Sequence, residues 1–149
     1  MIKTFLVSAF ALILAANVSY GQDIKQSQVP SVVVNKFHQT FPKAYDVEWE
    51  LNGDLYKVEF EMGATGYDHS VWYDKSGKVV KHKEEIAKSS LPKAILEVIA
   101  KDYSGYRVDD VKKYTENGKV TYKCELDSKT QDWKVTFDEN GKVLDKIAD

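Results

Sequence analysis

The chain has 149 residues, a formal net charge of −2 and a single cysteine. This length suits one domain, which cannot contain an internal disulfide. Acidic and basic residues are interspersed, whereas a nucleic-acid-binding protein normally carries a basic excess or stripe, so no nucleic-acid partner is expected. Cys124 alternates with apolar residues, so we expect a buried strand residue rather than a reactive thiol.

Residues 1–21 have the pattern of a secretory signal peptide. Lys3 precedes a mainly apolar stretch over residues 5–18, and small residues precede the predicted cut after Gly21. This stretch is shorter than the roughly 20 apolar residues that a membrane-spanning helix needs. We therefore expect a periplasmic or secreted protein with no membrane attachment after cleavage.

The remaining sequence contains two copies of one pattern. Val29-Pro30 recurs 62 residues later as Leu91-Pro92, and residues 71–79 recur 64 residues later as 135–143. We predict an N-terminal linker over 22–28, a first repeat over 29–84 and a second repeat over 85–149, which together form one continuous domain.

Each repeat is expected to begin with a helix. Apolar residues recur at four-residue spacing, which is typical of one helix face: Val29, Val33, Phe37 and Phe41. Pro30 stands in the first turn, where its missing N–H costs no hydrogen bond. Residues 91–103 repeat this apolar spacing and the proline in the first turn, so a second helix is predicted there. A shorter helix is predicted over 83–88.

Strands follow each helix. Polar and apolar residues alternate on both sides of Asn52-Gly53 and again through residues 70–73, and Gly77 ends a turn into a fourth strand at Val79. In the second repeat, Val111 and Tyr114 cannot share a face of the first strand without a bulge.

These patterns predict an α+β fold, a tandem repeat of helix plus antiparallel hairpins. The helices pack on one face of an antiparallel sheet of up to eight strands, and the other face meets water.

The landmarks of this pattern resemble a known family of secreted proteins. They are Val29-Pro30, Phe41-Pro42, Val47-Glu48-Trp49, Tyr56-Lys57-Val58, the Tyr73–Gly77 turn and Leu91-Pro92. Together they resemble the PepSY-like family, described as similar to β-lactamase inhibitor protein. The resemblance implies a tandem repeat with an open sheet surface. The namesake inhibitor grips an enzyme through that surface, and related PepSY domains restrain secreted peptidases. The inhibitor's disulfides and contact loops have no match here, so its target does not carry over.

Trp72 is the strongest candidate for a binding residue. Its neighbours Val71 and Tyr73 are expected to face the core, which directs Trp72 to the open face, and exposed Trp is enriched in binding hot spots. In the second repeat Thr136 replaces it, so the fold does not require an aromatic there. The alternative is a Trp covered by a neighbouring loop or strand.

Four further residues complete the predicted partner-binding set. The loop over 62–68 is longer than its counterpart in the second repeat and carries Tyr67 near its tip, and the other three lie on adjacent strand positions: Lys57, Glu59 and Glu61. The acidic row is either a solvated sheet face or a recognition surface for a basic partner.

The sequence offers no constellation for catalysis. Neither a nucleophile motif nor a cofactor motif is present, so we expect no enzyme activity and no cofactor. His38, His69 and His82 lack a second His or Cys at metal-ligand spacing, so no metal site is predicted. Asp74 and Asp138 begin turns that lack the remaining ligands of a calcium loop.

We therefore expect a non-enzymatic exported protein that binds a protein or peptide through the open sheet face, with inhibition of that partner as one outcome. The alternative is a periplasmic sensor or carrier that binds a small ligand or metal through Tyr67, Asp68 and His69.

Overall fold

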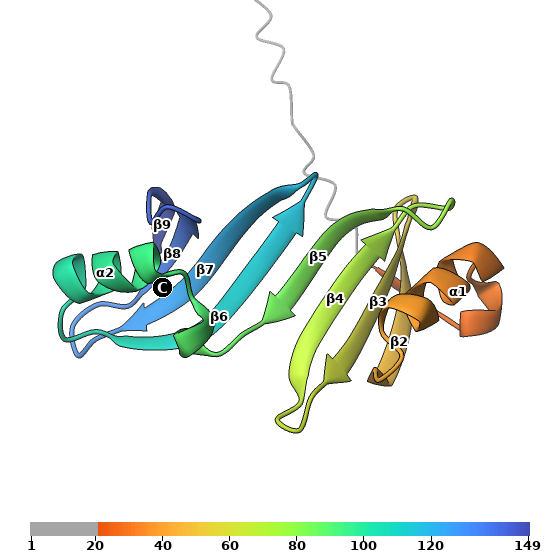
Figure 1. The fold of residues 1–149 in the computed structure, drawn as a ribbon, viewed down its shortest axis with the longest axis horizontal. Coiled ribbons are helices and arrows are strands. Elements are labelled where there is room, and N and C mark those ends of the chain that lie inside the picture. Colours follow the sequence, from red (N-terminus) through yellow and green to blue (C-terminus); the bar gives the residue numbers. More distant parts are fainter. Residues whose placement is uncertain (1–20) are drawn as a thin grey trace, which may run out of the picture.

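The computed structural model describes residues 21–149, so the predicted signal peptide lies outside the described residues except for Gly21. These residues form one nine-stranded antiparallel sheet with its strands in sequence order (Figure 1). The strands are β1 (Gln22–Ile24), β2 (Tyr45–Asn52), β3 (Leu55–Met62), β4 (Tyr67–Tyr73), β5 (Val79–Glu85), β6 (Arg107–Glu116), β7 (Lys119–Asp127), β8 (Trp133–Asp138) and β9 (Val143–Ala148). The α+β class and the open antiparallel sheet are confirmed.

Two helices accompany the sheet, α1 (Ser31–Thr40) and α2 (Lys93–Asp102), and each follows a proline at its N-cap. Single 3-10 turns precede them at Gln26–Gln28 and Lys88–Ser90. Among residues 21–149, no helix is long and apolar enough to cross a bilayer.

The ninth strand arises from the segment that was expected to be a linker. Gln22–Ile24 pairs with β2 from Leu51 back to Trp49, and Ile24 packs against the first core. A strand of three residues is too short to show an alternating pattern. Its structure depends on the unpaired edge that β2 offers, which single-sequence periodicity does not reveal.

Each helix covers its own hydrophobic core. In the first half, Phe37 of α1 is fully buried and its ring contacts Trp49 and Phe60 edge-on at centroid distances of 5.4 and 5.1 Å. In the second half, Ile95 of α2 is fully buried in a cluster that includes Leu126. Figure 1 shows the two helices toward opposite ends of the sheet, with β5 between them.

The strand register places both cores on the same side of the sheet. One row of paired residues crosses the molecule in the order Phe60, His69, Glu84, Lys113, Tyr122 and Phe137. Directly paired residues point to the same face. This face, the helix face, is apolar at both ends of the row and polar in the middle.

The two halves contain the same type of turn. The Asp74 carboxylate accepts the Ser76 and Lys78 backbone N–H groups at 2.8 and 3.1 Å, and Asp138 accepts the corresponding pair at 2.9 Å each. Gly77 and Gly141 end these turns with φ of 85° and 84°. The predicted turn structure is confirmed.

Both halves also share a bulge in their first long strand. Asp46 in β2 and Asp110 in β6 have φ of 50° and 40°, and the register shifts at both positions. The bulge in β6 does not bring Val111 and Tyr114 to one face, because Val111 faces the core whereas Tyr114 lies on the opposite face.

The predicted helix over 83–88 is wrong. β5 continues to Glu85 because it pairs with β6, and its cross-strand neighbours carry opposite charges: Lys81 with Glu116, Glu84 with Lys113 and Glu85 with Lys112. Opposite charges directly across a ladder are favourable, and this long-range pairing overrides the local helical pattern.

Phe37→Ala and Ile95→Ala should each lower the free energy of unfolding, by about 3–5 and about 2–5 kcal/mol, because each removes a fully buried side chain and leaves a cavity. Both should shift one shared transition in urea, since the two cores lie on one sheet. Val32→Ala on the exposed side of α1, where Val32 is 48% exposed, should change stability by under about 0.5 kcal/mol. Independent unfolding of the two halves would contradict this expectation.

Candidate functional sites on the two faces of the sheet

Trp72 lies on the face opposite the helices, here called the open face. Its backbone neighbours Val71 and Tyr73 are buried in the first core, at 1% and 0% exposure, and Trp72 itself is half-buried. The Lys57 and Lys81 ammonium groups lie 5.6 and 5.0 Å from its ring centroid. The Lys81 ammonium also lies 5.5 Å from the Tyr114 ring, so two aromatic rings and two cations form a strip across β3 to β6.

The charges on the β2 and β3 side of this strip are paired with one another. The Lys57 ammonium contacts the Glu50 and Glu59 carboxylates at 3.1 and 2.5 Å. Burial would lower the pKa of Lys57, but its hydrogen bonds to Glu59 and Glu50 reverse this and raise the pKa. Ser70 beneath them is only 3% exposed and its hydroxyl donates to Glu59 at 3.4 Å. Glu59 and Lys57 therefore support the strip from one side.

Lys83, next to the strip on β5, lacks such a partner. Burial lowers its pKa, and the nearby Lys112 cation lowers it further. Within residues 21–149, neither Lys81 nor Lys83 forms an ion pair. A half-buried ammonium beside other cations is an electrostatic cost to the isolated protein.

Carboxylates gather where the open face meets the bulge of β2. Together with Lys83, they line a hollow of about 280 Å³: Asp46, Glu48, Glu59, Glu61 and Asp68. The expected acidic row is thus part of an acidic concavity, and the open face combines this concavity with the cationic and aromatic strip.

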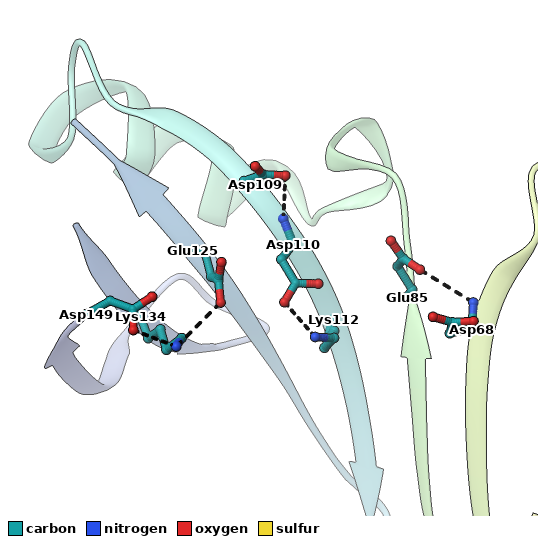
Figure 2. A network of polar contacts seen from close by, with 8 residues as sticks. All are labelled: Asp68, Glu85, Asp109, Asp110, Lys112, Glu125, Lys134 and Asp149. Atoms are coloured by element: carbon teal, nitrogen blue, oxygen red, sulfur yellow. Dashed lines mark hydrogen bonds and ion pairs between the residues drawn. The ribbon is translucent and has the colours of Figure 1, made fainter. Parts of the chain in front are cut away.

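Beyond Tyr114, the second half of the open face carries polar contacts (Figure 2). The Lys112 ammonium contacts Asp110 at the bulge of β6. The Lys134 ammonium joins Glu125 at 3.6 Å and Asp149 at 2.7 Å. Thr136, the counterpart of Trp72, is half-buried on this face. The two halves therefore differ in surface chemistry.

Tyr67 is separated from the other four residues of the predicted set. It begins β4 and pairs with Met62 of the first core, so the turn that precedes it is shorter than expected and its side chain shares the helix face with His69. Trp72, Lys57, Glu59 and Glu61 share the open face, as their register requires. Asp68 also lies on the open face, so the proposed set of Tyr67, Asp68 and His69 does not converge on one ligand.

His69 instead meets His82 and Glu84 in the middle of the helix face. The His69 Nδ1 atom lies 3.1 Å from His82 Nε2 and 3.8 Å from the Glu84 carboxylate, which lies 3.6 Å from His82 Nε2. Phe60 stacks on the His69 ring at 5.1 Å, and Phe41 contacts the His82 ring edge-on at 5.6 Å. The three polar groups occupy the region of the helix face between the two cores.

Burial lowers the pKa of both His69 and His82, and the nearby Glu84 only partly offsets this. For His82, the charges of His69 and Lys113 lower the pKa further. Both rings are therefore held toward the neutral form. Cys124, by contrast, is fully buried and burial raises the pKa of its thiol to about 12, which confirms an inert strand residue.

The fold and these surfaces define a class of protein: a helix-backed antiparallel sheet with one open, chemically diverse face. The chain belongs to the PepSY-like family. It matches the family described as "Putative beta-lactamase-inhibitor-like, PepSY-like" over residues 17–81 and again over 54–145. No curated protein matches the chain.

Solved structures share this fold at low sequence identity. A crystal structure described as "putative periplasmic proteins" from Bacteroides eggerthii is 18% identical, with a TM-score of 0.68 over 80% of this chain and 88% of that chain. A BLIP-like protein from Bacteroides fragilis is 20% identical, with a TM-score of 0.64 over 80% of this chain and 86% of that chain. A DUF2874 family protein from Bacteroides uniformis is 21% identical, with a TM-score of 0.67 over 80% and 89%.

The lowered pKa values of the two histidines predict a loss of stability in mild acid. The unfolded chain takes up protons at the ordinary histidine pKa of about 6.5, whereas the folded protein resists them, so stability is full above that pH and falls as the pH drops below it. His82→Gln should flatten the fall in urea-unfolding free energy between pH 7.5 and 5. An equal slope in the parent protein and in His82→Gln would refute the assignment.

Proposed function

We propose that this chain is an exported, non-enzymatic binding protein whose open face grips an acidic segment of a protein or peptide. The observation that carries the proposal is the Trp72 ring on that face, with two ammonium groups over it. Export is supported by the signal-peptide pattern of residues 1–21 and by the description of the related Bacteroides eggerthii protein as periplasmic.

The chemistry of the partner follows from which charges are already paired. Lys57 forms ion pairs with both Glu59 and Glu50, whereas within residues 21–149 neither Lys81 nor Lys83 forms an ion pair, although Lys81 faces Glu116 across the ladder. A partner carboxylate placed beside Lys83 would favour the charged form of this lysine, which burial and the nearby Lys112 cation disfavour. The open strip therefore favours an acidic partner, in place of the basic partner that the carboxylate row alone suggested.

Trp72 would supply the anchor for this contact. An aromatic side chain that is half-buried at its base offers contact area with few torsions left to restrict, which is why Trp is enriched at hot spots. The acidic hollow near Glu61 borders the strip, so it would repel partner segments whose acidic residues continue in that direction. Inhibition would result wherever the gripped segment includes a partner's working surface.

Trp72→Ala should weaken partner capture from periplasmic extract at least tenfold, because hot-spot truncations cost roughly 2 kcal/mol or more. The measurement is quantitative mass spectrometry of proteins retained on the immobilised chain. Thr136→Ala, the equivalent position in the other half, is the matched control and should retain the same partners. Equal retention by both variants would remove the open-face strip from consideration.

Lys83→Met should separate binding from stability. The substitution removes a cation whose charged form is disfavoured by burial and by the nearby Lys112, so the melting temperature should rise by a few degrees while retention of the partner falls. Lys119→Met, at an exposed position in β7, is the control and should alter neither property. A lower melting temperature in Lys83→Met would show that this lysine stabilises the fold, which would contradict its proposed role in partner binding.

A further inference from the structure

The histidine pair on the helix face has the dimensions of a metal site. His69 Nδ1, His82 Nε2 and a Glu84 carboxylate oxygen all lie within 4.8 Å of one another. Tetrahedral coordination with bonds of about 2.0–2.1 Å places ligand atoms roughly 3.4 Å apart. The three observed separations of 3.1, 3.6 and 3.8 Å bracket that value, so a metal ion fits after shifts of a few tenths of an ångström.

We propose that His69, His82 and Glu84 bind a divalent first-row transition metal, with Zn²⁺ as the best match to the donors. Two imidazoles and one carboxylate are a donor set that zinc accepts, and they leave a fourth position for water or an exogenous ligand. Ions such as calcium prefer oxygen ligands only, so two ring nitrogens select against them.

The surroundings of the two histidine rings favour metal binding already in the metal-free protein. In the metal-free protein one ring donates an N–H to the other across 3.1 Å, and a metal would take the place of that shared proton. Metal ligation requires neutral imidazole, which burial already favours at both positions. Stacking on Phe60 and edge contact with Phe41 restrict the ring orientations further.

Lys113 has two opposing effects on the affinity of the site for a metal ion. Its ammonium lies 3.5 Å from the second carboxylate oxygen of Glu84, which leaves the first oxygen facing the histidines. This contact orients the carboxylate, in the manner of the groups behind metal ligands in other proteins. Its positive charge also opposes a bound cation. Lys113→Gln should therefore keep the site and tighten metal binding.

The site is independent of the proposed open-face binding. His69 and His82 point away from Trp72 and Lys83, because neighbouring residues on a strand face opposite sides of the sheet. A bound metal would link β4 to β5 on the helix face, in the region between the two cores. Its presence can therefore be tested without any knowledge of the partner.

The experiment is a thermal and calorimetric titration of the tag-free protein with Zn²⁺ alone. Zinc at 100 times its dissociation constant should raise the melting temperature by about 10 °C, and calorimetry should give one site per chain. His82→Gln and Glu84→Gln should each weaken zinc binding at least tenfold. His38→Gln, which alters the remaining histidine, should bind zinc as the parent does, and Ca²⁺ should leave the melting temperature unchanged.

Two outcomes would overturn the site. One is a melting temperature that does not respond to Zn²⁺ in the parent protein. The other is undiminished zinc binding in both His82→Gln and Glu84→Gln. If His82→Gln does not fold, Glu84→Gln decides alone, since this change keeps the size of the side chain and removes only the charge.

Discussion

The pairing of β5 with β6 is the constraint on which the rest of the structure depends. It joins two helix-backed halves, each with its own core, into one continuous sheet. Without it, each half would present an unpaired edge strand, which in isolated sheets invites aggregation. The junction contains charged residues rather than apolar ones, and its oppositely charged pairs across the ladder specify which residues meet.

That junction also explains where polar chemistry accumulates. Neither helix reaches the middle of the sheet, so the helix-face side chains of β5 need not be apolar. His82 and Glu84 occupy these positions and meet His69 from β4. On the reverse side, the same strands carry Trp72, Lys81 and Lys83. In this middle region of the described sheet, polar and charged side chains therefore lie on both faces.

Most of the fold could be predicted from the sequence because it rests on local signals. Asn-Gly and Asp-Gly-type turns fix hairpins, four-residue apolar spacing fixes α1 and α2, and alternation assigned Trp72 to the open face. The short strand β1 and the continuation of β5 were missed, since both exist through pairing with a distant or edge strand. Residues 83–88 were predicted as a short helix, because their local pattern does not reveal the pairing of β5 with β6.

The histidine cluster was missed for a more specific reason, the register of one hairpin. Tyr73 pairs with Val79 at the turn, and continuing that register would pair His69 with Lys83, on the face away from His82. The structure contains an irregularity between Trp72 and Tyr73, after which His69 pairs with Glu84 instead. A one-residue slip moves every side chain of a strand to the other face. The bulge therefore brings the three proposed ligand groups together on the helix face. It also places Lys81 and Lys83 on the same face as Trp72. One backbone irregularity thus determines the chemistry of both sides of the sheet.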